Sequence, residues 1–237
     1  MGVGDNPKRF YKTVAVAPDG DGWAVHLDGR AIKTPAKTSL TIPCQGLAEA
    51  IAAEWDAQES ELDLASMTLT KLANVAIDRT PGNREAMADE LAKYAETDVT
   101  CYLAEGPTPL RERQDESWRP WRDWAGKALG IVLVPVEGIV AMPQPQASLD
   151  LVRNHALGLD NFRLTALAWG CSLFGSAVLA LAVEQGALEA PKALQIASVD
   201  EDWQIETWGS DDEAVLARNI RENEARALAA WFTGLNA

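Results

Sequence analysis

The chain has 237 residues, of which 47% are hydrophobic and 24% charged, a composition typical of a globular protein with one large domain or two small ones. Its formal net charge of −14 at pH 7 argues against nucleic acid and anionic membrane surfaces as partners, because both would repel it. The same charge permits a protein partner that presents basic residues.

Three widely spaced cysteines, Cys44, Cys101 and Cys171, form no CxxC pair. This spacing supports neither a disulfide framework nor a zinc site, so we expect free thiols in a reducing compartment. The two histidines, His26 and His155, have no further ligand type nearby in the sequence. We expect surface or helix-end roles for them, and we expect no bound metal or cofactor.

The first 45 residues alternate between apolar and polar positions, which predicts a β-meander. Asp28-Gly29 is a hairpin dipeptide. The segment 19–22, Asp-Gly-Asp-Gly, resembles the start of a calcium loop, but Trp23 and Val25 occupy later ligand positions, so a turn is expected instead. Strands are expected at Phe10–Ala17, around Trp23–Leu27, at Ala31–Thr34 and at Leu40–Ile42.

Helical spacing follows, with Leu47, Ile51 and Trp55 four residues apart. Gly106 to Pro109 is the most obvious break, and the pattern after it is mainly helical. We therefore predict an α+β fold, with an N-terminal α+β domain over 1–106 and a helical C-terminal domain over 107–237. Helices are expected at 46–59, 66–79, 83–96, 114–129, 147–157, 161–184, 191–197, 200–208 and 211–232, and extended pieces at 97–103, 131–134 and 139–141.

Leu164–Val183 is a run of 20 residues without charge, long enough to span a bilayer. Its many alanines, with Gly170, Gly175 and several hydroxyl residues, make its hydrophobicity modest, and no basic cluster or aromatic belt sets an orientation. A buried central helix is expected instead.

Evidence for enzyme chemistry is thin. Gly170–Gly175 misses the spacing of a nucleophile elbow and lies inside a helical pattern. Paired carboxylates such as Asp78 and Asp98 leave open an alternative, a hydrolase or transferase that uses buried carboxylates. Trp118, Trp121 and Trp124 recur every third residue, a stripe more typical of a core or domain-interface seam than of a ligand site. Tryptophan is also a frequent hot-spot residue at protein interfaces.

The segment Ser198–Gly209, SVDEDWQIETWG, sets four acids beside two tryptophans. Ser198 with Glu201 has the spacing of a capping box, and Gly209 is a typical helix end, with Ser210 or Asp211 expected to cap the next helix. Capping does not explain the aromatics. On a helix Glu201, Ile205 and Trp208 share one face, so we also expect a docking surface for a basic or amphipathic partner.

Seven collinear segments together resemble the ATP synthase assembly chaperone family that binds the F₁ α subunit. Four lie in the first half of the chain: RFYK (9–12), LDGRAIKTP (27–35), EW (54–55) and MTLTKLANVAID (67–78). Three follow: YAETDVTCY (94–102), SWRPWRDW (117–124) and DEDWQIETWG (200–209). The resemblance covers nearly the whole chain in the right order, although no single motif is decisive.

The resemblance implies a chaperone without enzyme activity that holds unassembled ATP synthase α subunits. It also implies a β-containing N-terminal domain and a helical C-terminal domain. The partner-binding positions that it implies are Glu201, Asp202, Trp203, Glu206 and Trp208. The chain departs from the family pattern where Val99 follows Thr97-Asp98, where Asp202 replaces a usual Glu and where Ala214-Val215 lacks a histidine. The last departure removes any shared role for that position.

The N-terminal segment MGVGDNPKRFYK lacks the apolar core of a signal peptide and the pattern of a transit peptide. We therefore expect a bacterial cytoplasmic protein, or a mitochondrial matrix protein whose presequence is missing, without stable membrane insertion.

Overall fold

The computed structural model describes residues 7–138, 140 and 142–237. Two compact units can be distinguished: unit 1 comprises residues 1–82 and 230–237, and unit 2 comprises residues 83–229. A small sheet lies near the N-terminus and helices make up most of the rest, which confirms the predicted α+β class. The predicted domain boundary after residue 106 remains a prediction.

The sheet of unit 1 is built around β2 (Gly22–Leu27), which pairs antiparallel with β1 (Val14–Asp19) on one edge. Its other edge pairs with β3 (Arg30–Ala31) and β4 (Thr41–Ile42). Both predicted turns are confirmed: Asp19 pairs with Gly22, and Asp28 and Gly29 have φ values of 48° and 79° between β2 and β3.

The first strand begins four residues later than expected. The backbone N–H groups of Lys12 and Thr13 donate to the Asp28 carboxylate at distances from 2.8 to 3.2 Å. A side chain of the β2–β3 turn thus satisfies donors that a neighbouring strand would otherwise take. The alternating pattern from Phe10 onward did not reveal this competition.

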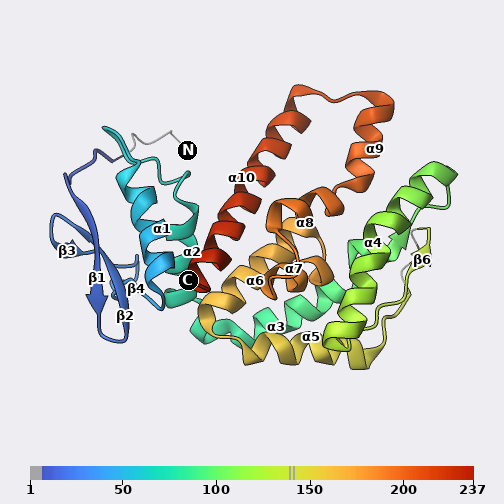
Figure 1. The fold of residues 1–237 in the computed structure, drawn as a ribbon, viewed down its shortest axis with the longest axis horizontal. Helices are drawn as coiled ribbons and strands as arrows, with labels where there is room; N and C mark the ends of the chain where they lie inside the picture. Colours follow the sequence, from blue (N-terminus) through green and yellow to red (C-terminus); the bar gives the residue numbers. More distant parts are fainter. Residues whose placement is uncertain (1–6, 139, 141) are drawn as a thin grey trace. The chain divides into compact units, whose positions relative to one another are not determined.

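Helix α1 (Gln45–Asp56) packs on β1 and β2 (Figure 1) and buries Leu47 and Ile51. Helix α2 (Thr68–Asp78) begins where the Glu54 carboxylate accepts from the backbone N–H groups of Leu69 and Thr70, at 2.7 and 2.8 Å. A carboxylate from α1 thereby satisfies two of the orphan donors at the start of α2.

The last residues of the chain complete unit 1. Trp231, Phe232 and Leu235 are buried there. A Cβ on Gly234 would come within 2.7 Å of the Leu47 Cα atom, and a Cβ on Gly46 within 3.1 Å of the Gly234 carbonyl oxygen. Only glycine allows the backbones to approach so closely.

Unit 2 is arranged around α7 (Ala177–Glu184), all of whose residues are buried, and α4, α6 and α8 contact it (Figure 1). Two short parallel strands pair at its side, and a 3₁₀ helix occupies part of the segment 97–103 that was expected to be extended. The predicted extended piece 139–141 lies largely outside the described residues. The other elements are α3 (Thr80–Glu96), η1 (Val99–Cys101), β5 (Tyr102–Leu103), α4 (Thr108–Leu129), β6 (Val136–Glu137), α5 (Gln146–Gly158), α6 (Asn161–Phe174), α8 (Ala190–Ala197), α9 (Val199–Trp208) and α10 (Asp212–Leu235).

The uncharged segment 164–183 is buried as expected, but it does not form a single helix. Gly175 has a φ of +62° and ends α6, and the Ser176 hydroxyl caps α7 by accepting from the Leu179 N–H at 3.0 Å. The prediction of one helix over 161–184 is therefore wrong. Among the helices of the described residues, none is both long and apolar enough to cross a membrane.

The three tryptophans of the predicted stripe, Trp118, Trp121 and Trp124, have different environments in the structure. Trp118 is fully buried and its indole Nε1 donates to the Ile196 carbonyl at 2.8 Å, so the core interpretation is confirmed for this residue. Trp121 and Trp124 are half-buried and meet edge to face, with ring centroids 6.4 Å apart. A spacing of three residues drifts around a helix, which is why the later indoles leave the core.

Candidate partner-binding site

The predicted site residues lie on α9, which forms a helical hairpin with α10 (Figure 1). We call α9, residues 209–211 and the part of α10 up to Ala229 the α9–α10 hairpin; it belongs to unit 2. Nearly all of residues 209–220 are exposed, whereas Ala225 and Leu228 are buried. The hairpin is anchored at its base and presents its tip to solvent.

The predicted capping box is wrong, because the Ser198 side chain accepts no hydrogen bond from α9. Ser198 instead ends α8, where its N–H donates to the Leu194 carbonyl, and its own carbonyl accepts from the Asp202 N–H at 2.8 Å. The chain passes from α8 into α9 without the extended residue that a cap requires. At the other end, Gly209 follows the last residue of α9, and Asp211 caps α10 by accepting from the Ala214 N–H at 2.7 Å.

Two acids of α9 are held by α4. The Asp200 carboxylate accepts from the Gln114 side-chain amide at 2.6 Å. The Glu206 carboxylate pairs with the Arg113 guanidinium at 2.7 Å. This hydrogen bond lowers the pKa of Glu206 and raises that of Arg113. Because both side chains of the second pair are exposed to solvent, which screens the charges, the pair adds little to stability.

The other two acids are held by α10. Glu201 accepts from the Arg221 guanidinium with both carboxylate oxygens, each at 2.7 Å. Asp202 pairs with Arg218, and its side chain is only 21% exposed, compared with 55% for Glu201. The four acids therefore do not form a free ridge. They hold α9 between α4 and α10.

The two tryptophans of α9 line pockets in unit 2. Trp203 and Trp208 both line a pocket of about 710 Å³, whose other walls come from residues 102–107, the start of α4 and Gly138. Trp208 also lines a second pocket, of about 350 Å³, formed by α9 and α10. Glu201 and Ile205 share this second pocket with Trp208, as helical spacing predicts. The Trp208 side chain is 77% exposed between these two hollows.

Helix α10 adds an apolar surface that the sequence analysis did not identify. Val215, Leu216 and Ile220 are 46%, 61% and 51% exposed. In the sequence they stand out as aliphatic residues in an otherwise polar helix. The expected helix 211–232 nevertheless gave no reason to expect their side chains to be exposed to solvent. With Trp208 they are exposed apolar side chains of one hairpin, but none of the three lines the pockets beside Trp208.

The carboxylates considered for enzyme chemistry have structural partners. Asp98 is fully buried in unit 2 and accepts from the backbone N–H groups of Thr100 and Val178 and from the Ser176 hydroxyl. Burial raises its pKa. Asp78 lies in unit 1, where it accepts from the Thr34 hydroxyl at 2.7 Å. Each carboxylate is held by groups of its own unit.

The remaining candidates are also accounted for. His155 Nε2 lies 3.0 Å from the Glu184 carboxylate, which is buried and also pairs with Arg163. His26 Nδ1 lies 3.3 Å from the Gly29 carbonyl. Among the described residues, no group of three or more His, Cys, Asp or Glu side chains is arranged to hold a metal ion.

Comparisons with known proteins agree with each other. Residues 8–126 match the family described as ATP12 chaperone protein. The mitochondrial protein atp12 of Schizosaccharomyces pombe is 27% identical over 219 residues, which cover 87% of this chain and 75% of that protein. The crystal structure of Atp12 from Paracoccus denitrificans has a TM-score of 0.90 and 37% identity, covering 96% of this chain and 97% of that one.

A third similar protein is Atu1473 from Agrobacterium tumefaciens, whose crystal structure is described as that of a chaperone candidate. It has a TM-score of 0.91 and 36% identity and covers 97% of this chain and 86% of that one. The family match spans half of the chain, and the solved structures match nearly all of it. The chain therefore belongs to the ATP12 chaperone family, and it is a chaperone and not an enzyme.

Proposed function

We propose that the protein is an assembly chaperone of the ATP synthase F₁ sector, which binds the unassembled α subunit until the β subunit displaces it. Membership of the ATP12 chaperone family supports this role, as does the resemblance of seven collinear segments. The observation that carries the choice of surface is Trp208, 77% exposed between two pockets on the α9–α10 hairpin.

The surface suits an unassembled subunit. Such a subunit exposes partly apolar surface that its neighbours will later cover, and exposed apolar surface aggregates. Trp208 can bury its ring against the client, while the flanking pockets of about 710 and 350 Å³ accept client side chains. Val215, Leu216 and Ile220 of α10, which lie outside the two pockets, offer further apolar contacts.

The acids of α9 contact the client by exchanging their arginine partners for basic side chains of the client. Glu201 and Glu206 are more than half exposed, so their pairs with Arg221 and Arg113 are screened by solvent and add little to stability. A basic side chain of the client can replace either arginine at little loss, and the released arginine returns to solvent. Asp202 is more enclosed against Arg218, so in this proposal it positions α9 while Trp203 forms a pocket wall.

Release follows from competition. A contact made of one anchor, a few aliphatic residues and exchangeable ion pairs gives modest affinity and rapid dissociation. The β subunit then displaces the chaperone by binding the same surface of the α subunit more tightly than the chaperone does. The cycle therefore needs no nucleotide.

The test is capture of purified α subunit by the immobilised protein, with β subunit as the competitor. Trp208→Ala is expected to weaken capture by tenfold or more, about 1.4 kcal/mol or greater, because it removes the anchor. Leu151→Ala on α5 is the matched control, since Leu151 is also exposed, at 41%, and lies outside the hairpin. Glu206→Lys is expected to weaken capture, whereas Glu116→Lys on α4, which is also exposed to solvent, is not.

Two results would count against the proposal. Preferential retention of β over α, or no retention of α, would show that the client is a different protein. Equal losses in Trp208→Ala and Leu151→Ala, with unchanged circular dichroism, would show that the hairpin is not the contact. The compartment in this proposal is the bacterial cytoplasm or the mitochondrial matrix; the Schizosaccharomyces pombe relative is named as mitochondrial.

A further inference from the structure

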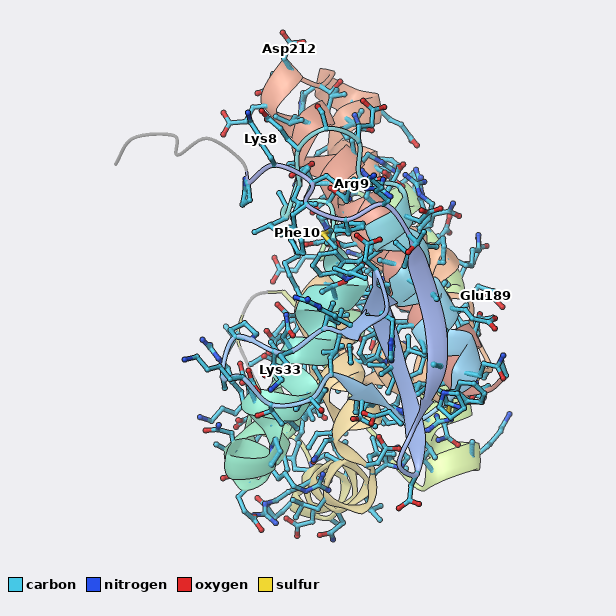
Figure 2. The ribbon with its side chains drawn as sticks, turned by 90° about the vertical axis from the view of Figure 1, so that its left-hand side faces the viewer. Lys8, Arg9, Phe10, Lys33, Glu189 and Asp212 are labelled. Atoms are coloured by element: carbon cyan, nitrogen blue, oxygen red, sulfur yellow. The ribbon has the colours of Figure 1, made fainter. Side chains whose placement is uncertain are left out.

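Unit 1 contains a pocket of about 550 Å³ that lies outside the surface proposed for the α subunit. Its walls come from three places: the segment before β1, the β2–β3 hairpin with the residues after it, and the end of α1. Figure 2 labels Phe10 from the first place and Lys33 from the second. The lining residues are Phe10, Tyr11, Leu27, Asp28, Arg30, Ala31, Ile32, Lys33 and Trp55.

The floor of the pocket is an aromatic cluster. The ring of Tyr11 meets those of Phe10 and Trp55 edge to face, with centroid distances of 5.3 and 5.8 Å. Its hydroxyl donates to the Trp55 carbonyl at 2.6 Å, which fixes the end of α1 against the segment before β1. Leu27 and Ile32 pack against this cluster. The floor is therefore apolar and held in place by unit 1 itself.

Phe10 is exposed although it borders this cluster. Its side chain is 72% exposed, compared with 5% for Tyr11 next to it. A single exposed apolar residue needs no explanation. Here, however, the exposed ring stands at the mouth of an apolar hollow, where an incoming side chain can be enclosed from two sides.

The rim of the pocket is basic in a strongly acidic protein. Arg30 and Lys33 are exposed, and neither forms an ion pair within 4.0 Å with the described residues. Asp28, the acid in the lining, turns its carboxylate to the backbone N–H groups of Lys12 and Thr13. The two cations are thus available to a ligand, and they make the rim locally basic in a chain whose net charge is −14.

We propose that this pocket docks a segment of a partner protein in which an aromatic or large aliphatic side chain is flanked by carboxylates. The apolar side chain enters between Phe10 and Trp55, and the carboxylates face Arg30 and Lys33. This site is opposite in charge to the surface proposed on the hairpin, where acids of α9 meet basic side chains of the client. It rests on the protein being a chaperone with protein clients, but it does not depend on the α subunit being the client.

The experiment uses the full chain and three fluorescein-labelled peptides of twelve residues in a Gly/Ser background, read by fluorescence anisotropy. The first carries a central Phe flanked by Glu residues, the second has Lys in place of Glu, and the third has Ser in place of Phe. We expect the first to bind at least about fivefold more tightly than either of the others, and its affinity to fall as salt rises.

Variants locate the binding. Lys33→Glu is expected to weaken binding of the first peptide by about fivefold or more. Lys71→Glu, which makes the same charge change on α2 of unit 1, is expected to leave it unchanged. Phe10→Ser is expected to weaken binding, whereas Leu64→Ser, at a residue that is 50% exposed and outside the pocket, is not. Trp208→Ala should have no effect on this peptide.

Equal binding of the three peptides, absence of binding at ~1 mM protein, or equal losses in Lys33→Glu and Lys71→Glu would each overturn the proposal. So would a Phe10-dependent self-association of the chain in analytical ultracentrifugation, which would make a second copy the occupant. Because none of these readouts involves the α subunit, failure here leaves the hairpin proposal standing. Failure of α-subunit capture likewise leaves the peptide result intact.

Discussion

Two surfaces of the protein, one in each unit, differ in how their charged side chains are used. In unit 2, arginines bridge elements: Arg113 reaches α9 from α4, and Arg218 and Arg221 reach it from α10. In unit 1, Arg30 and Lys33 stand at the rim of an apolar pocket without a carboxylate partner among the described residues. A charge with an internal partner positions a helix, whereas a charge without one is available to a ligand.

A second comparison concerns two carboxylates, one in each unit, that join segments distant in sequence. Asp98 does this inside unit 2, fully buried, by accepting from groups of η1 and the start of α7. Glu54 does it in unit 1, partly exposed, by accepting from the start of α2. The lesson to test is that an enclosed carboxylate with several partners, such as Asp98, contributes more to folding than a partly exposed one, such as Glu54.

The largest expected effect tests that lesson in unit 2. Asp98→Ala leaves the buried N–H groups of Thr100 and Val178 and the Ser176 hydroxyl without their acceptor, and we expect the free energy of unfolding to fall by about 3–5 kcal/mol. Urea denaturation followed by circular dichroism measures it. Asp78→Ala is the control, because Asp78 is less enclosed and accepts from Thr34 and Ala36, with an expected loss of about 1–2 kcal/mol. Equal losses would break the comparison.

A smaller effect is expected in unit 1. Glu54→Ala removes the acceptor for the first turn of α2, and we expect a loss of about 1–2 kcal/mol in the free energy of unfolding. Glu49→Ala, an exposed position on the same helix, should change it by less than about 0.5 kcal/mol. Unchanged stability in Glu54→Ala would mean that water replaces the carboxylate at the start of α2.

Glu54 also gives a pH dependence with a definite sign. Burial raises its pKa, so between its unfolded and folded values the folded state binds a proton that the unfolded state has lost. The contribution of this group to stability therefore declines as pH rises through that window. Glu54→Gln should remove the decline, and a slope that persists in this variant would assign it to another carboxyl group.

The smallest effect concerns the exposed pair on the hairpin. The Arg113 guanidinium lowers the pKa of Glu206, so the stabilisation is present above the unfolded pKa and lost as pH falls through the folded one. Carboxyl-carbon NMR should show Glu206 titrating below the ordinary value of a glutamate. In Arg113→Gln the pKa of Glu206 should return toward its ordinary value. If Glu206 titrates normally in the unaltered protein, the pair does not persist in solution and Glu206 is already free for a client.

The sequence could predict local features whose cause is local. The turns at 19–22 and 28–29 are set by glycines and small acids, and they form as predicted. The limits of α9 were predicted to within one residue, because Gly209 marks its end. Gly175-Ser176 could have indicated the break between α6 and α7. The uncharged residues around it instead led to the prediction of one continuous helix.

The rest depended on partners far away along the chain. The spacing of Ser198 and Glu201 suggested a capping box, yet the path of α8 into α9 leaves no extended residue to act as a cap. Glu206 meets an arginine 93 positions earlier, which no pattern near residue 206 could reveal. The exposure of Trp208 depends on how α9 packs against α4 and α10, a property of unit 2 rather than of the segment 198–209.

The glycine contact between Gly234 and the start of α1 has a consequence for biosynthesis. Unit 1 is discontinuous, so its first 82 residues leave the ribosome well before Trp231, Phe232 and Leu235, which fill part of its interior. The intervening 147 residues of unit 2 have the opportunity to fold first, since domains fold as units during synthesis. A nascent chain of this protein thus carries an incomplete sheet–helix layer until Trp231, Phe232 and Leu235 have left the ribosome.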